Sequence, residues 1–338
     1  MGTDMAEAVP HGAVVSMEAR IAEIAATVRE EPVYRSPFNS WDAKASVRNG
    51  PRRLLGEDVE GFLFFPPELV PCVTHPLVAA RGPDATSALL VQRLYQYLHF
   101  TTELESVAVI PVTSMIARNR SGLVLPDRMK ADAFAITTDE AWHAQFSDDL
   151  THQIERTLGL PSNVSPDPYF VTRLNQIRHE LGAEAAGYVD LAFSIVSETL
   201  ISAVLADLPR DTRLPTAVRD LVQDHALDEG RHHAYFRKLL TYFWAALGHR
   251  DRRLIGCWFP ELIRTFLAPD HGAGLRMLVG IGLTTAEATT VIMETHDAAE
   301  TDRRIAAAAA STVRYLAEVG ALDDQRTRES FMEAGMLP

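Results

Sequence analysis

Cysteine is nearly absent from this 338-residue sequence, which contains only Cys72 and Cys257. Two cysteines exclude a disulfide framework and a cysteine-rich metal site, and they suit a reducing compartment. The first residues include Asp4 and Glu7 and show no basic segment followed by an apolar one, the pattern of a secretory signal. We therefore expect a cytoplasmic protein.

Positive charge is scarce as well, because 32 Lys and Arg residues face 45 Asp and Glu residues and give a formal net charge of −13. Without a dense basic patch, we expect neither nucleic acid nor an anionic membrane as a partner. No apolar run approaches the roughly 20 residues of a transmembrane helix. There is no convincing strand pattern and no glycine-rich phosphate loop. With 47% hydrophobic residues, the composition is typical of a soluble globular protein. The lack of a strand pattern favours an all-α fold.

Prolines interrupt the chain between residues 32 and 83 often enough to exclude a long helix there. They are Pro32, Pro37, Pro51, Pro66, Pro67, Pro71, Pro76 and Pro83. We expect residues 1–83 to form a disordered leader, a short helix from Met17 to Arg29 and an irregular wrap. Residues 84–338 are expected to form a single helical domain, with a core bundle at 84–247 and accessory helices at 251–338.

Helical periodicity dominates the rest of the sequence. Four long helices are predicted, at Ser87–Ala117, Asp127–Leu158, Tyr169–Leu208 and Thr216–Leu247. Pro111 is expected to kink the first of them, and Gly182 and Gly187 interrupt the periodicity of the third. Shorter helices are predicted at Leu254–Leu267, Ala273–Leu283, Ala286–Val319 and Gln325–Gly335.

Two Glu-x-x-His pairs lie on the second and fourth predicted long helices, Glu140 with His143 and Glu229 with His232. Residues three and four positions apart share one face of a helix, so the members of each pair project together. On the fourth helix, His225 lies four residues before Glu229 and joins the same face. Each of these helices therefore presents a cluster of potential metal ligands.

Each of the other two long helices carries a glutamate in an apolar setting. Glu198 lies inside the apolar run of the third helix, where an unpartnered carboxylate would be costly to bury. The first helix offers Glu103 and Glu105, which are two positions apart and face different directions. Spacing alone leaves the choice between these two open.

The order Glu, Glu-x-x-His, Glu, Glu-x-x-His is typical of four-helix bundles that hold two iron or manganese ions. Carboxylates and imidazoles suit these ions and leave positions open for dioxygen, whereas zinc prefers a tetrahedral site. Asp139 and Asp228 precede the two paired glutamates and are predicted to accept hydrogen bonds from ligand imidazoles. The sequence therefore predicts a ferritin-like four-helix bundle with a di-metal core, and iron is favoured over manganese.

Four segments of the chain resemble the p-aminobenzoate N-oxygenase family of di-iron proteins. They are Thr102-Glu103-Leu104-Glu105 with a proline six residues on, Asp139-Glu140-x-x-His143, Ser197-Glu198-Thr199 and His225-x-x-Asp228-Glu229-x-x-His232. The additional His225 distinguishes this family from ferritins and ribonucleotide reductase small subunits, and Pro111 aligns Glu105 with the first family ligand. The ligand set that the resemblance implies is Glu105, Glu140, His143, Glu198, His225, Glu229 and His232.

The resemblance implies an O2-dependent enzyme that converts an aryl amine to its hydroxylamine, nitroso or nitro product, through a peroxo-diferric intermediate. It implies two iron ions per chain, a homodimer and a place in secondary-metabolite or antibiotic biosynthesis. An external reductase must supply electrons, because no flavin, nicotinamide or iron–sulfur motif is present. The alternatives are another di-metal oxidase that acts on C–H or aldehyde substrates, and a ferritin-like ferroxidase or iron store.

Phe100 occupies the position at which family members that act on small aromatic amino acids carry an arginine. A buried carboxylate would lack its charge partner there, so a larger or neutral aromatic amine is favoured over an aminobenzoate. The candidate wall residues of the substrate site are Tyr97, Phe100, Leu104, Trp142, Phe146, Val196 and Leu200. Outside the site, His233 is expected to point away from its neighbour His232, and His296 and Asp297 are expected on the surface of the last long helix.

Overall fold

The computed structural model describes residues 34–56, 59–204 and 208–338. The helix predicted at Met17–Arg29 lies outside these residues. Within the described ranges every regular element is helical and no strand occurs, which confirms the all-α prediction. None of the described helices is long and apolar enough to cross a membrane.

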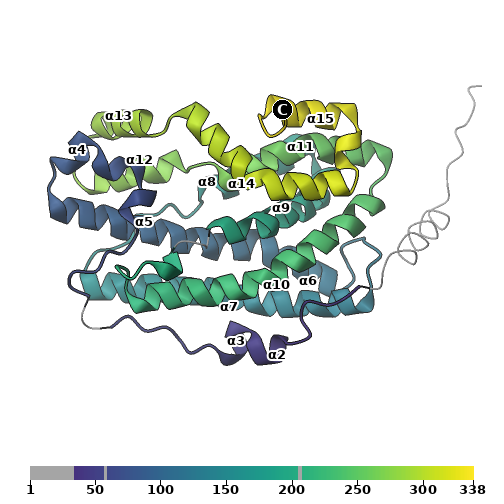
Figure 1. The fold of residues 1–338 in the computed structure, drawn as a ribbon, viewed down its shortest axis with the longest axis horizontal. Coiled ribbons are helices and arrows are strands. Elements are labelled where there is room, and N and C mark those ends of the chain that lie inside the picture. Colours follow the sequence, from purple (N-terminus) through teal and green to yellow (C-terminus); the bar gives the residue numbers. More distant parts are fainter. Residues whose placement is uncertain (1–33, 57–58, 205–207) are drawn as a thin grey trace, which may run out of the picture.

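Four long helical segments form the central bundle (Figure 1). The first consists of α5 (Pro83–Leu104), a π-helical turn (Glu105–Val109) and α6 (Ile110–Ala117), and the others are α7 (Asp127–Leu158), α9 (Ala183–Val204) and α10 (Thr216–Ala246). α7 packs against α5, α6 and α10, and α9 packs against α10 and the π-helical turn. The middles of all four segments therefore face a common interior.

The first segment widens into a π-helical turn directly before Pro111, where the sequence predicted a kink. Proline has no backbone N–H, so Pro111 cannot donate to the carbonyl of Val107 as the α-helical pattern requires. The chain instead forms a wider turn, in which the N–H of Ile110 donates to the carbonyl of Glu105. Such π turns are frequent at functional sites, and this one begins at a candidate ligand.

Two predicted helices are in fact broken. The helix predicted at Tyr169–Leu208 is α8 (Tyr169–Leu181) followed by α9, because Gly182 adopts φ 79° and ψ 167°. That conformation is essentially restricted to glycine.

The helix predicted at Ala286–Val319 is likewise two helices, α13 (Thr285–Thr295) and α14 (Ala298–Glu318). The placement of His296 and Asp297 inside one long helix was therefore wrong. Asp297 stands at the break, where its carboxylate accepts the backbone N–H of Glu300 and caps α14.

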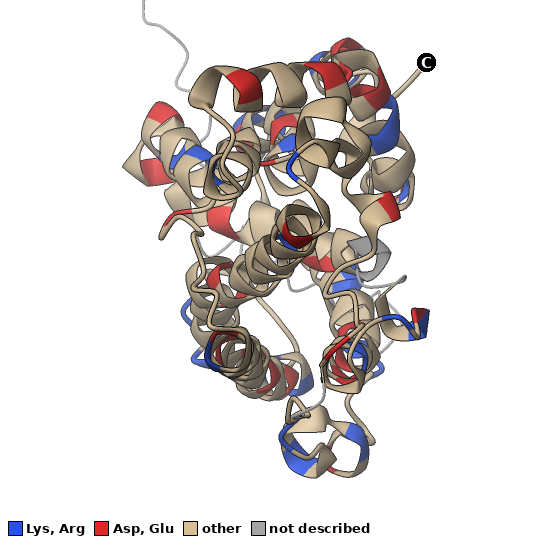
Figure 2. Ribbon diagram, turned by 90° about the vertical axis from the view of Figure 1, so that its left-hand side faces the viewer, with Lys and Arg blue, Asp and Glu red and all other residues tan. Residues whose placement is uncertain are grey.

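The N-terminal wrap includes the short elements α2 (Trp41–Lys44), α3 (Ser46–Asn49), the 3₁₀ turns Pro67–Leu69 and Pro71–Thr74, and α4 (Pro76–Ala79). The helices α2 and α3 lie on one side of the bundle, and the C-terminal helices lie on the opposite side (Figure 1, Figure 2). The wrap crosses to that opposite side before α4, and the turn Pro71–Thr74 contacts α13. Three of these five elements begin with a proline, which suits the first position of a helix because its N–H would be unpaired there. α3 contacts both α7 and α10.

The accessory helices surround the bundle. They are α8, α11 (His249–Leu267), α12 (His271–Gly280), α13, α14 and α15 (Gln325–Glu333), together with the short 3₁₀ turn Ala321–Asp323. The 3₁₀ turn Leu208–Arg210 packs on α10, and α12 packs on α5. α8, α11 and α14 all contact α9 directly. This helix is therefore enclosed from both sides, which explains why Glu198 on it is buried.

Substitution of Gly182 tests the break between α8 and α9. The Gly182→Ala variant should lose about 1–3 kcal/mol in the free energy of unfolding, because alanine is strained at this positive φ. The control is Gly187→Ala, at an exposed position inside α9 where an added Cβ meets nothing within 4 Å. That change should stabilise the protein by about 0.5–1 kcal/mol. Equal effects of the two substitutions in denaturant titrations would contradict the assignment.

Candidate metal centre

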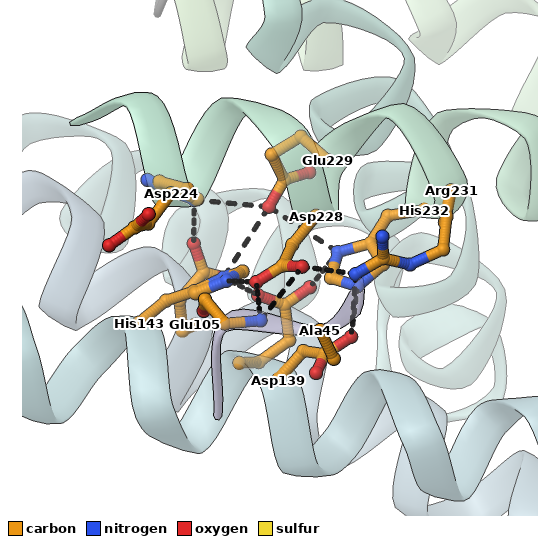
Figure 3. A network of polar contacts seen from close by, with 12 residues as sticks. Ala45, Glu105, Asp139, His143, Asp224, Asp228, Glu229, Arg231 and His232 are labelled. Atoms are coloured by element: carbon orange, nitrogen blue, oxygen red, sulfur yellow. Dashed lines mark hydrogen bonds and ion pairs between the residues drawn. The ribbon is translucent and has the colours of Figure 1, made fainter. Parts of the chain in front are cut away.

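The structure brings together all seven side chains that the sequence singles out as ligands, in the interior of the bundle. Figure 3 shows Glu105, His143, Glu229 and His232 among them. The π-helical turn supplies one carboxylate, α7 a carboxylate and an imidazole, α9 one carboxylate, and α10 a carboxylate and two imidazoles. In that order they are Glu105, Glu140, His143, Glu198, Glu229, His225 and His232. None of these residues is more than 1% exposed.

The seven residues form two overlapping groups whose candidate ligand atoms lie within 4.8 Å of one another. One group consists of Glu105, Glu140, His143, His225 and Glu229. The other consists of Glu140, Glu198, Glu229 and His232. Glu140 and Glu229 belong to both groups, and the arrangement is consistent with a di-metal site.

The structure also separates the two glutamates of the first helix. Glu105 opens the π-helical turn and belongs to the cluster. Glu103 is partly exposed and belongs to neither group. The residue that points into the bundle is thus the one that Pro111 follows six positions later.

Several carboxylate oxygens in the cluster lack any hydrogen-bond donor. Oε2 of Glu105, both carboxylate oxygens of Glu198 and Oε2 of Glu229 are buried without a partner. Buried polar groups in proteins are almost always paired, and an unpaired buried carboxylate is especially costly. These oxygens therefore fit a site that holds cations.

Raised pKa values of two glutamates indicate the same need for positive charge. Burial, together with the negative charges of Glu140 and Glu198, raises the pKa of Glu105 well above its usual range. Burial and the negative charges of Glu229 and Glu140 do the same to the pKa of Glu198. Bound cations would remove this repulsion and keep all four carboxylates ionised at neutral pH.

Two aspartates beside the cluster bind imidazoles in a crossed arrangement. Oδ2 of Asp139 on α7 lies 3.1 Å from Nε2 of His232 on α10. Oδ2 of Asp228 on α10 lies 3.2 Å from Nε2 of His143 on α7. Because Nε2–H of each ring donates to an aspartate, Nδ1 of each ring points toward the cluster. There, Nδ1 of His143 lies 2.7 Å from Oε2 of Glu140, and Nδ1 of His232 lies 2.9 Å from Oε1 of Glu140. The aspartates therefore fix the orientation of both rings and tie α7 to α10.

The sequence of the chain also matches known proteins. A family model described as the p-aminobenzoate N-oxygenase AurF matches residues 53–320, which is more than half of the chain. The chain belongs to the AurF family of p-aminobenzoate N-oxygenases. This is a family of amine N-oxygenases, and so the chain is an enzyme of that class.

A curated relative agrees with the family match. The 4-aminobenzoate N-oxygenase of Streptomyces thioluteus is 25% identical over 230 residues, which cover 66% of this chain and 67% of the relative. This distant similarity supports the N-oxygenase class.

In this AurF-family chain the N-terminal wrap completes the centre, and sequence reasoning missed its contribution. The indole Nε1 of Trp41 donates to both oxygens of Asp139, at 2.8 and 2.9 Å. The backbone N–H of Ser46 donates to Asp228, and the ring of Phe38 stacks on His232 with 6.0 Å between centroids. The wrap is aperiodic, so no pattern in the sequence links these residues to the ligands.

A partly buried arginine between the two aspartates was missed as well. The guanidinium of Arg231 forms an ion pair with Asp228 and lies 3.9 Å from Asp139. Burial acts to raise the pKa of Asp228, but the hydrogen bond and charge of His143, the hydrogen bond from Ser46 and the charge of Arg231 together hold it below its usual range. In the sequence, Arg231 cannot be distinguished from a solvent-exposed arginine on a helix. Only its contacts with the two aspartates show that it belongs to the centre.

The seven residues predicted to line the substrate site differ in how deeply they are buried. Tyr97, Leu104, Phe146, Val196 and Leu200 are buried, whereas Phe100 and Trp142 are partly buried. The ring of Phe146 lies 5.3 Å from that of His143 and 6.0 Å from that of His225, and it packs on Trp142.

Phe100 instead packs against rings outside the four-helix core. Its ring centroid lies 4.9 Å from that of Phe170 on α8 and 5.7 Å from that of Phe266 on α11. The accessory helices thus occupy the space around this side chain. On α10, His233 points away from the cluster as expected, and its Nε2 lies 3.2 Å from the hydroxyl of Tyr315.

Replacement of Trp41 tests the contribution of the wrap. In Trp41→Phe, Asp139 loses its indole donor and holds the ring of His232 less firmly. We expect the affinity for ferrous iron, measured by competition with a chelator, to fall about 10–100-fold. The control is Trp258→Phe on α11, which removes an indole N–H outside the cluster and should leave the affinity unchanged. Equal affinities in the two variants would contradict a role for the wrap.

Proposed function

We propose that this enzyme binds two iron ions and uses dioxygen to oxidise the nitrogen of an aryl amine to a hydroxylamine, nitroso or nitro group. The observation that supports this most directly is the buried cluster of four carboxylates and three imidazoles in two overlapping groups. Membership of the AurF family supports the choice of nitrogen as the atom that is oxidised.

The proposed ligand assignment follows the two groups. Glu105, His143 and His225 would hold one ion, and Glu198 and His232 would hold the other. Glu140 and Glu229, which belong to both groups, would contribute to holding both ions. Four carboxylates suit iron better than zinc, which prefers a tetrahedral site with nitrogen or sulfur ligands.

When bound, the iron ions supply the activation of dioxygen, and the protein supplies orientation, charge and exclusion of water. The seven candidate ligands are at most 1% exposed, so bulk water has no direct access to them. Asp139 and Asp228 hold the Nε2–H protons of His232 and His143 and so keep both Nδ1 atoms available as ligands. Burial of the ring of Phe146 beside His143 and His225 keeps one side of the cluster apolar.

The proposed reaction requires an electron donor. Conversion of an amine to a hydroxylamine takes one oxygen atom from O2, and the other leaves as water with two electrons and two protons. The sequence contains no flavin, nicotinamide or iron–sulfur motif, so we propose that an external reductase delivers the electrons. We also propose a homodimer in the cytoplasm that acts in secondary metabolism, as the resemblance suggests.

Oxidation of a panel of aryl amines under ¹⁸O2 tests the proposed function. The iron-loaded enzyme with a chemical reductant should give products whose nitrogen carries labelled oxygen, as seen by mass spectrometry. Products labelled on carbon would favour a C–H or aldehyde oxidase. Iron oxidation that no amine affects, with accumulation of ferric mineral, would favour a ferroxidase or iron store.

Substitution of His225 tests the ligand assignment separately from activity. His225→Ala should lower the iron content of purified protein from two ions per chain toward one, because one group loses an imidazole. His233→Ala is the matched control on the same helix, since His233 bonds to Tyr315 and lies outside both groups. A normal iron content in the His225 variant would remove this residue from the ligand set.

A further inference from the structure

Two adjoining hollows form one surface groove between the C-terminal half of α10, the start of α11 and the end of α14. Their volumes are about 620 and 550 Å³. Residues 234–253 and 315–324 supply the lining, and Trp244 and Arg252 belong to both hollows. Because the two hollows share these residues, we treat them as a single groove, the α10–α14 groove.

The α10–α14 groove is positively charged on a protein that is negatively charged as a whole. Five Lys or Arg side chains and three Asp or Glu side chains line it, which gives a formal net charge of +2, whereas the whole chain carries −13. A local reversal of sign attracts an acidic partner that the rest of the surface repels. The charged lining residues are Arg237, Lys238, Arg250, Arg252, Arg253, Glu318, Asp323 and Asp324.

Ion pairs inside the groove neutralise only some of its cations. Arg237 binds Glu318 at 3.0 Å, and Arg253 binds Asp324 at 3.2 Å. The guanidinium of Arg252 instead donates to two backbone carbonyls of α10, which carry no charge. In the part of the chain that the structure describes, no carboxylate forms an ion pair with Arg252. The groove therefore retains positive charge for an anionic partner.

The groove also lies beside the candidate metal centre. Ala234 lines the groove two residues after the candidate ligand His232, which is about 3 Å along the helix axis. Tyr315 on α14 lines the groove as well, and its hydroxyl lies 3.2 Å from Nε2 of His233, the residue next to His232. The groove thus occupies the outer face of the same helix that supplies three candidate ligands.

We propose that the α10–α14 groove docks the external electron donor, and that this donor is a small, acidic iron–sulfur protein. The inference rests on the proposed function, in which electrons must reach the iron ions from outside the chain. Each donor molecule loses one electron from its reduced cluster and converts one ferric ion to ferrous, so two donors act in succession. Attraction between opposite charges speeds such encounters, and electron-transfer complexes need only a small interface that separates readily.

The scarcity of lysine allows a cross-linker to locate the docked donor. The chain contains only three lysines, Lys44 on α2, Lys130 on α7 and Lys238 in the groove. A carbodiimide joins a lysine amine to a carboxylate that touches it, and mass spectrometry identifies the joined residues. With the iron-loaded protein and a plant-type [2Fe–2S] ferredoxin, the cross-link should form at Lys238. Cross-links only at Lys44 or Lys130, or none at any lysine, would overturn the proposal.

Removal of charge from the groove should slow electron transfer. The diferric protein is mixed anaerobically with reduced ferredoxin, and oxidation of the ferredoxin cluster is followed by stopped-flow absorbance. The double variant Arg237→Gln with Arg250→Gln should lower the second-order rate constant on the order of tenfold at low ionic strength, and added salt should shrink the difference. Reduction by dithionite, which needs no docking, should be equally fast in this variant and in the parent protein.

The matched control is Arg35→Gln with Lys44→Gln, which removes two exposed positive charges from the N-terminal wrap. This variant should accept electrons from ferredoxin as fast as the parent protein. Equal rate constants in the two double variants would contradict docking in the groove. A slower rate in the wrap variant alone would place the donor over α2 and would overturn the proposal as well.

The outcomes for docking and for N-oxygenation are distinguishable. A cross-link at Lys238 with charge-dependent reduction, but without labelled oxygen in any product, would support docking and overturn N-oxygenation. Labelled nitrogen products formed with a chemical reductant, with a ferredoxin that neither cross-links nor reduces the protein, would support N-oxygenation and overturn docking. Calorimetric binding of inorganic pyrophosphate that the groove variant loses, without any binding of ferredoxin, would make the groove a small-anion site and would also overturn docking.

Discussion

Mutual repulsion among four buried carboxylates is the constraint on which the rest of the structure depends. Each of the four bundle segments places one of them in a common interior, where several of their oxygens have no donor. Without cations, that arrangement would oppose folding of the bundle, because burial favours the neutral form of a carboxyl group. Bound cations would therefore stabilise the centre and the bundle together.

The elements around the centre maintain its geometry from outside. Asp139 and Asp228 cross between α7 and α10 to hold the imidazoles, and Arg231 lies between them. Trp41 and the backbone of Ser46 then bind the two aspartates from the N-terminal wrap. An irregular segment that is distant in sequence from α7 and α10 thus closes the site. Its loss would remove hydrogen bonds that orient the ligand imidazoles and would weaken metal binding.

The sequence predicted the features that periodicity and ligand chemistry determine, and missed those that depend on contacts. The helix Asp127–Leu158 has the predicted bounds, and the ligand-type residues meet because three- and four-residue spacings put them on inward faces. The break at Gly182 was recognised only as an interruption, because apolar periodicity resumes on both sides. The contacts of Trp41 with α7 follow from no local pattern. The surroundings of Phe100 depend on α8 and α11, which pack against it from distant parts of the chain.

Anomalous diffraction at the iron absorption edge, from crystals grown anaerobically with ferrous iron, tests the central claim most directly. The account predicts two strong peaks inside the bundle, one among Glu105, His143 and His225 and the other beside Glu198 and His232. The carboxylates of the two shared glutamates should lie between the peaks. A single peak, or no peak within the cluster, would contradict the assignment of the buried carboxylates to a di-iron centre.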